Sequence, residues 1–278
     1  MNVVLVDLET GEILENFKGK TLKTIKQQRE YLVKYNEILT DNKYGDFVWC
    51  LYDVSKEYFP NIKPQHIARM MYIISYLGYD GYLVYDNGRA ITKQGLLKKI
   101  KVARTQSEEF YDEMVANNIF IEQDGKIYIN ACYFCKGSIK KITKHHKSIT
   151  RIYSNSIREI YESIPPALHK HLGYIFKVIP FVNTHYNILC SNPLESVYEN
   201  IQPLSLNEFC NIIHYSEKHK KEIVFSLCNE FYTNRQRAIN FIHSDIKREK
   251  IHKNCIIINS RIYHAGENWE LINGIGKF

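Results

Sequence analysis

Two short polar segments carry residue types that can read the edges of DNA bases. The segments are Arg104, Thr105, Gln106 and Ser107, and Glu217, Lys218, His219, Lys220 and Lys221. Arginine can pair bidentately with guanine, and glutamine with adenine, so the first segment suits base recognition. Lysine behaves as a point charge, so the second segment suits contacts to phosphate. Either segment could equally be the solvated face of a helix.

Two other groups could hold a metal or catalyse a reaction. Cys132 and Cys135 form a single C-x-x-C pair, whereas zinc needs two further ligands, such as the nearby His145 and His146. A nicking enzyme needs paired histidines on a strand, but His169-Lys170-His171 lies in a helical pattern, so its imidazoles point to different sides. Phosphate-binding glycine motifs are also absent from the sequence. We therefore expect a protein that is not an enzyme and that has no cofactor and no metal.

The two polar segments belong to an internal repeat. Residues 91–100 align with residues 204–213, and the alignment continues without a gap to Met114 and Leu227. Thr92 and the equivalent Ser205 are suitable N-caps for a short amphipathic helix. A turn and a longer helix follow, so each copy predicts a helix-turn-helix that presents a polar segment at the start of its second helix.

The residues around each helix-turn-helix extend the repeat. After the first copy, Asp124-Gly125 between alternating apolar residues predicts a β-hairpin. Residues 239–243 and 255–259 predict a hairpin after the second copy, which has about sixteen extra residues in or before its hairpin. Each copy is preceded by one more helix, over residues 64–77 and 166–179. In this alignment Cys132 matches Arg261 and Cys135 matches His264, which favours a structural strand exit over a zinc site.

This order of elements predicts an α+β fold of two tandem winged helix-turn-helix domains behind a small N-terminal α/β leader. The expected divisions are a leader over 1–62, a first winged helix over 63–140, a basic linker and connecting helix over 141–163, and a second winged helix over 164–278. In the leader we expect a hairpin, a helix over residues 20–39 and a strand over 47–51. The alternative is two unrelated α+β domains with chance similarity.

The charge distribution suggests a polyanionic partner. The net charge is +7, and residues 1–60 contain eight basic and ten acidic side chains, so the excess of positive charge lies beyond them. We expect further DNA contacts from basic residues of the hairpins and linker, although these could form disordered charged loops. They are Lys126, Lys140, Lys141, Lys144, Lys247, Arg248, Lys250 and Lys253.

The whole length of the sequence resembles a group of firmicute phage and plasmid DNA-binding proteins described as replication initiators or regulators, and the second half carries this resemblance best. The segments that carry the resemblance are Arg158–Tyr161, Pro165-Pro166, His169–Tyr174, Tyr186–Cys190, Asn192–Glu195, Ile201–Leu204 and Gly274–Phe278. The expected architecture is also similar to that of plasmid initiators whose two winged helices bind origin repeats. A likeness of architecture implies function only weakly.

We therefore expect sequence-specific binding of double-stranded DNA, most simply in initiating phage or plasmid replication. A transcriptional regulator needs the same surface, and a winged-helix scaffold that binds protein is a third alternative. A homodimer formed through the leader and contacts with replication or transcription machinery stay open. Seven scattered cysteines and the lack of a signal peptide or membrane span predict a cytoplasmic protein.

Overall fold

The computed structural model describes residues 2–6, 13–18, 45–51, 59–137, 149–243 and 254–264. The chain separates into two compact units, Met1–Tyr44 and Gly45–Phe278. In the first unit, β1 (Asn2–Val6) pairs with β2 (Ile13–Lys18) as the antiparallel hairpin that the sequence predicts. The helix expected over residues 20–39 lies outside the described residues.

The second unit is a mixed α+β structure. Its described part contains seven α-helices and several small antiparallel sheets. The largest sheet has four strands, in the order β12, β7, β3 and β6. Their bounds are Tyr263–His264, Ile149–Tyr153, Phe47–Leu51 and Phe134–Cys135.

The first half of this unit follows the predicted order of elements. They are α3 (Pro64–Ile74), α4 (Lys93–Lys99), α5 (Arg104–Ala116), β4 (Phe120–Gln123) and β5 (Lys126–Ile129). The Thr92 side chain caps α4 by accepting a hydrogen bond from the Gly95 N–H. Asp124 and Gly125 both have positive φ, as a tight hairpin turn between β4 and β5 requires.

The second half repeats this order with additions. Its α-helices and longer strands after β7 are α6 (Ser154–Ser163), α7 (His169–Lys177), α8 (Leu206–Ile213), α9 (Lys220–Asn229), β10 (Ile239–His243) and β11 (Asn254–Ile258). Ser205 and Glu208 form a complete capping box at α8. A short hairpin of β8 (Tyr232–Thr233) and β9 (Gln236–Arg237) lies between α9 and β10, and it accounts for part of the extra length predicted there.

The repeat extends to individual hydrogen bonds. The Asn130 N–H bonds to the Ile119 carbonyl, and the Asn259 N–H bonds to the Ala238 carbonyl. The side-chain amides of Asn130 and Asn259 likewise donate to the preceding carbonyls, those of Asn118 and Arg237. Both asparagines lead into the last strand of their half, so the C-x-x-C segment exits into strand β6 as the alignment predicts.

The four-stranded sheet joins the two halves symmetrically. Trp49 of β3 pairs with Arg151 of β7, and these two residues occupy equivalent positions in their own halves. Trp49 also pairs with Cys135 in β6, just as Arg151 pairs with His264 in β12. A local two-fold axis therefore passes through the Trp49–Arg151 pair.

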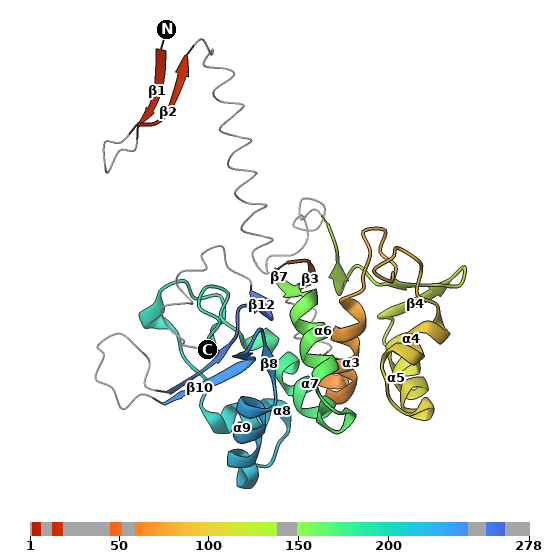
Figure 1. Ribbon diagram of the computed structural model, residues 1–278. Coiled ribbons are helices and arrows are strands. Elements are labelled where there is room, and N and C mark those ends of the chain that lie inside the picture. Colours follow the sequence, from red (N-terminus) through yellow and green to blue (C-terminus); the bar gives the residue numbers. More distant parts are fainter. Residues whose placement is uncertain are drawn as a thin grey trace. The chain divides into compact units, whose positions relative to one another are not determined.

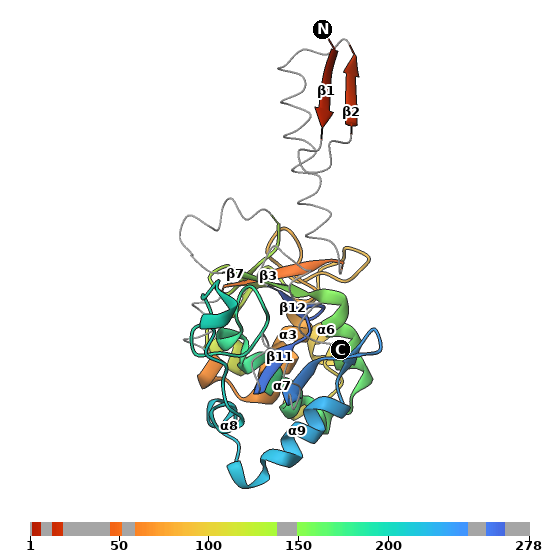
Figure 2. The same cartoon turned by 90° about the vertical axis from the view of Figure 1, so that its left-hand side faces the viewer.

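The helices follow the same symmetry. α3 and α7 pack against each other, α5 contacts α3, and both α8 and α9 contact α7. Figure 1 shows α3 and α7 in the middle of the unit, with α4 and α5 beside α3 and with α8 and α9 on the other side of α7. Figure 2, which is turned by 90°, shows the four-stranded sheet at one end of the second unit and α8 and α9 at the opposite end. The pair α4–α5 of the first half and the pair α8–α9 of the second half thus lie on either side of a centre formed by α3 and α7.

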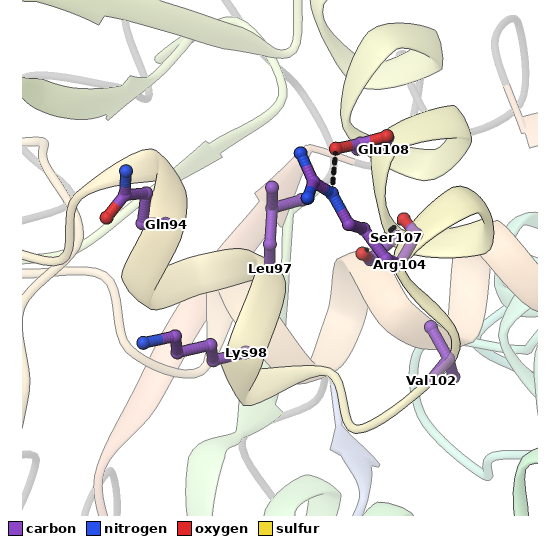
Figure 3. A pocket seen from close by; sticks show the side chains of 7 residues that line it. All are labelled: Gln94, Leu97, Lys98, Val102, Arg104, Ser107 and Glu108. Atoms are coloured by element: carbon purple, nitrogen blue, oxygen red, sulfur yellow. Dashed lines mark hydrogen bonds and ion pairs between the residues drawn. The ribbon is translucent and has the colours of Figure 1, made fainter.

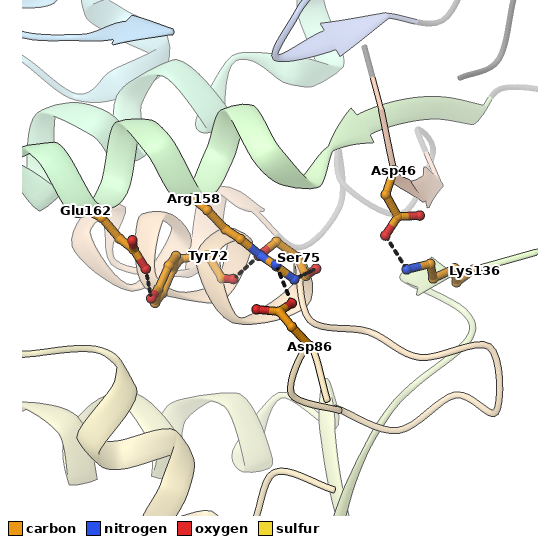
Figure 4. A network of polar contacts seen from close by, with 7 residues as sticks. All are labelled: Asp46, Tyr72, Ser75, Asp86, Lys136, Arg158 and Glu162. Carbon is orange, nitrogen blue, oxygen red and sulfur yellow. Dashed lines mark hydrogen bonds and ion pairs between the residues drawn. The ribbon is translucent and has the colours of Figure 1, made fainter. Parts of the chain in front are cut away.

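A polar network links α6 of the second half to the first half (Figure 4). The Arg158 guanidinium donates to the carbonyl and hydroxyl oxygens of Ser75 at 2.7 and 3.0 Å, and it pairs with Asp86 at 2.7 Å. It also stacks over the Tyr76 ring, 3.5 Å from the ring centroid. Tyr72 donates to Glu162 at 2.6 Å. These contacts tie the end of α3 to α6.

The shared sheet changes two expected divisions. The strand over 47–51, assigned to the leader from the sequence, is a central strand of the second unit, which begins at Gly45. Residues 149–163, assigned to a linker and a connecting helix, form strand β7 and the expected helix, α6, and both contribute buried side chains to the core. Strand partners distant in sequence decide these placements, so local patterns could not reveal them.

Candidate nucleic-acid interface

The start of α5 is open to solvent. Ala103 precedes the helix and has no side chain that could cap it, so the first-turn N–H groups of α5 are available to a ligand. Thr105 and Gln106 are exposed, and the Arg104 side chain is 88% exposed. A helix N-terminus with free N–H groups favours anions, including phosphate.

Arg104 lies beside a groove between α4 and α5 (Figure 3). The groove has a volume of about 400 Å³, and Gln94, Leu97 and Lys98 of α4 line it opposite Arg104 and Glu108 of α5. The Arg104 Nε donates to the Glu108 carboxylate at 2.8 Å. Because both side chains are solvated, this pair is weak and can exchange for a DNA contact.

Ser107 differs from its predicted role. Only 2% of its surface is exposed, and its Oγ donates to the Arg104 carbonyl oxygen at 2.8 Å. It lies on the side of α5 that also buries Phe110 and Met114, which explains the error: the helical phase places it inward. The prediction that Ser107 contacts DNA does not fit this burial.

Beyond its first turn, α5 is acidic, a feature that the sequence analysis missed. Glu108 pairs with Arg104, Glu109 with Lys63, and Glu113 with His66. The hydrogen bond from Lys63 lowers the pKa of Glu109, so this carboxylate stays charged. Asp112 is exposed on the same helix. The first turn of α5 is therefore its basic part, since it contains Arg104 and no acidic residue, whereas most of the carboxylates further along are paired with neighbouring cations.

The second helix pair presents a different surface. Glu217, Lys218 and His219 form a 3₁₀ turn, and the α-helix begins only at Lys220. Lys218 and Lys221 are exposed, whereas Lys220 is half-buried as a residue and its Nζ donates to the Asn207 side chain at 2.8 Å. His219 pairs with Glu222 at 2.9 Å. Lys218 and Lys221 are thus the lysines here with the greatest access to phosphate.

An exposed aromatic residue on α9 was not anticipated from the sequence. Phe225 is 67% exposed and lines an apolar groove of about 360 Å³ together with Leu206 and Val224. Lys221 and Arg237 lie at the same groove. The helical spacing of the sequence already indicates this exposure, because Phe225 falls outside the stripe formed by the buried Ile223 and Leu227. The repeat alignment identifies only the residues of that stripe.

The predicted hairpin and linker contacts can be followed only in part. Lys126, at the first hairpin turn, is half-buried, and its Nζ lies 4.5 Å from the centroid of the Tyr82 ring. The other basic residues predicted to contact DNA from the linker and the second hairpin lie outside the described residues. They are Lys140, Lys141, Lys144, Lys247, Arg248, Lys250 and Lys253.

The residues considered as metal ligands or catalytic groups lie in surroundings that suit packing rather than chemistry. No cluster of three or more His, Cys, Asp and Glu side chains suited to a metal occurs among the described residues. Burial raises the pKa of the Cys135 thiol to about 11, which leaves it protonated and unreactive near neutral pH. His169 stacks on Tyr161, and His171 bonds to Ser226 on α9. Both histidines lie in α7, in the helical setting that the sequence predicts.

Comparison of the whole chain with family models, curated proteins and solved structures gives no match. Within the described ranges, no helix has the length and apolar character needed to cross a bilayer. The assignment of a function therefore depends on the geometry described above.

Proposed function

We propose that the second unit consists of two fused winged helices that bind double-stranded DNA without catalysis. The observation that carries this proposal is the open first turn of α5, where Arg104, Thr105 and Gln106 surround uncapped N–H groups. The helix pair, its following hairpin and the short strand segment at Tyr82 and Leu83 that pairs with it occur in the order of a winged helix.

The two halves would read DNA differently. The first turn of α5 offers an arginine and a glutamine, which suit guanine and adenine. The second helix pair offers Lys218, in the turn before α9, and Lys221 of α9 for phosphates, and Phe225 of α9 for thymine methyl groups. Since the two helices differ, a single chain would bind an asymmetric site made of two unlike sub-sites.

The favoured role is initiation of phage or plasmid replication, and it rests on the resemblance of the sequence to firmicute phage and plasmid DNA-binding proteins. A transcriptional regulator would use the same surface. Mapping the sites bound in the cell distinguishes the two roles. An array of repeats in the replicon supports initiation, whereas a single promoter site supports regulation.

The DNA-binding proposal is tested by footprinting, followed by insertion of base pairs between the two sub-sites. Successive major grooves on one face lie about 34 Å, or roughly 10 base pairs, apart, so two fused readers should protect about two turns. Inserting about five base pairs puts the sub-sites on opposite faces and should abolish tight binding. An insertion of about ten is the matched control and should be less damaging. Equal binding to both insertions would refute joint reading by the two halves.

A second candidate function, protein binding, is favoured by the apolar groove around Phe225 and the acidic body of α5. Under this alternative the chain binds no DNA fragment even at low salt, where non-specific electrostatic binding is strongest. Under the DNA-binding proposal affinity falls steeply with salt, with a slope of about −0.9 per phosphate neutralised. A titration across salt concentrations therefore separates the two candidates.

A further inference from the structure

Arg69 of α3 is a buried charge with few partners. Only 4% of its surface is exposed, its Nε has no hydrogen-bond partner, and its Nη1 donates to the Gln106 carbonyl at 3.3 Å. None of the ion pairs among the described residues includes Arg69. A guanidinium keeps its charge at physiological pH, and a buried charge without an ion pair is costly. Burial lowers the pKa of Arg69, and the nearby Glu109 carboxylate, which is itself paired with Lys63, offsets this only in part. This side chain is therefore suited to an anion that arrives from outside.

The pocket lined by Arg69 offers the means to bind such an anion. It has a volume of about 380 Å³ and lies between α3, the start of α5 and the segment Pro166–Lys170 of the second half. Lys170 lines it and is exposed, so it adds a second positive charge. Glu109 also lines it, but this carboxylate is already paired with Lys63.

Arg69 and Lys170 bring hydrogen-bond donors to this pocket, and the side-chain amides of Gln65 and Gln106 can donate as well. Arginine and lysine side chains can only donate, and the uncapped N–H groups at the start of α5 lie next to Gln106, which lines the pocket. A fitting ligand must therefore accept several hydrogen bonds at once and carry negative charge. A phosphate group meets both requirements.

We propose that this pocket is a phosphate site, in which Arg69 and Lys170 hold one backbone phosphate of the DNA that the first turn of α5 contacts. The phosphate would lie between residues of both halves and fix the position of DNA relative to the shared helix pair. The source of the phosphate in this inference rests on the proposed DNA binding. The capacity of the pocket to bind phosphate does not.

The DNA source is tested with a cognate duplex in which single phosphates are replaced, one at a time, by neutral methylphosphonates. For the unaltered protein, one replacement near the α5 sub-site should weaken binding about tenfold, the effect of losing a charge-assisted hydrogen bond. In Lys170→Ala the same replacement should have little further effect. Arg89→Ala removes another exposed cation, from a loop outside the pocket, and should leave the tenfold effect intact.

The pocket itself is tested without DNA by titrating inorganic phosphate while following the melting temperature and the Lys170 and Gln106 NMR resonances. Phosphate should stabilise the unaltered protein and Arg89→Ala, but not Lys170→Ala or Arg69→Lys, which keeps the charge and loses the planar fork. Stabilisation without a matching methylphosphonate position would overturn the DNA source and leave a site for free phosphate. An absence of both effects would overturn the phosphate site, even if the protein binds DNA through α5.

Discussion

Gly173 of α7 meets α3 at the backbone of Pro64, where an added Cβ would lie 1.7 Å from the Pro64 carbonyl oxygen. Such a distance is far inside van der Waals contact, so the two helices cross closely only because residue 173 has no side chain. The contact lies in the helix pair that joins the two halves.

Gly173→Ala should therefore destabilise the fold, although alanine favours a helix over glycine by about 1 kcal/mol. We expect a net loss of about 1–3 kcal/mol, the usual cost of overpacking, in urea unfolding. Gly95→Ala is the matched control. Its Cβ would meet the hydroxyl end of Tyr85, which can rotate away, so the loss should be smaller. Equal losses would show that close helix contact at Gly173 is not the cause.

Arg158→Lys should also reduce the free energy of unfolding, by about 1–3 kcal/mol. Lysine cannot bond both oxygens of Ser75 while stacking on Tyr76, so it would leave buried acceptors unpaired. Asp86→Asn tests the outer part of the same network. Its carboxylate side chain is 76% exposed, so this substitution should cost little. If both variants lose a similar free energy of unfolding, the exposed Arg158–Asp86 ion pair, and not the bonds to Ser75, accounts for the contribution of Arg158.

Stability should fall as the pH decreases from about 6.5. Burial, with a contribution from Arg69, lowers the pKa of His169 to about 4. The folded state therefore keeps His169 neutral, while the unfolded chain takes up a proton below its ordinary pKa. The stabilisation is complete above pH 6.5 and is lost as the pH falls through about 4, at roughly 1.4 kcal/mol per pH unit for one proton.

The measurement is urea unfolding between pH 5 and 7 for the unaltered chain and for His169→Phe, which keeps an aromatic ring against Tyr161. The variant should show a pH slope smaller by about one proton. His66 and His171 have lowered pKa values too, again mainly through burial, so some slope should remain. An unchanged slope in the variant would contradict the assignment to His169.

Substitutions at the two helix starts should have different effects on DNA binding. Arg104→Ala should weaken cognate binding by about 1–3 kcal/mol and relax base preference, whereas Lys218→Ala should weaken all sequences and lower the salt slope by about one. Glu108→Gln releases Arg104 from its ion pair and removes a negative charge, so it should strengthen binding. The reverse pattern in a competition assay would make α9 the reader.

Phe225→Ala should weaken binding at the second sub-site without loss of stability, because the side chain is exposed. If the ring contacts thymine methyl groups, replacing those thymines by uracil should weaken the unaltered protein but not the variant. Leu194→Ala, another exposed apolar residue outside the helix pair, is the control and should change nothing. If the unaltered protein binds the thymine and uracil duplexes equally well, the groove around Phe225 does not read thymine methyl groups, and a protein partner becomes the better candidate for it.

The local elements of this fold were predictable because they depend on neighbouring residues. The caps at Thr92 and Ser205 and the Asp124-Gly125 turn are confirmed as helix and hairpin signals. The pairing of β3 with β7 was not predictable, since it joins residues about one hundred positions apart without a local signal. The exposure of Arg104 agrees with the sequence, but the burial of Ser107 depends on a helical phase that its polarity concealed. DNA binding and the winged-helix assignment stay predictions.

The pairing of Trp49 with its own equivalent, Arg151, gives one chain the symmetry of a homodimer. A half-chain cut between residues 137 and 149 would expose the edge of β3 or β7, and a bare strand edge pairs readily with another copy. Two identical halves could close the same sheet around the same axis. The second unit thus has the arrangement of a homodimer in which one chain supplies both copies. In a fused chain the two helix pairs need not be identical, so under the proposed DNA binding two unlike sub-sites take the place of a palindrome.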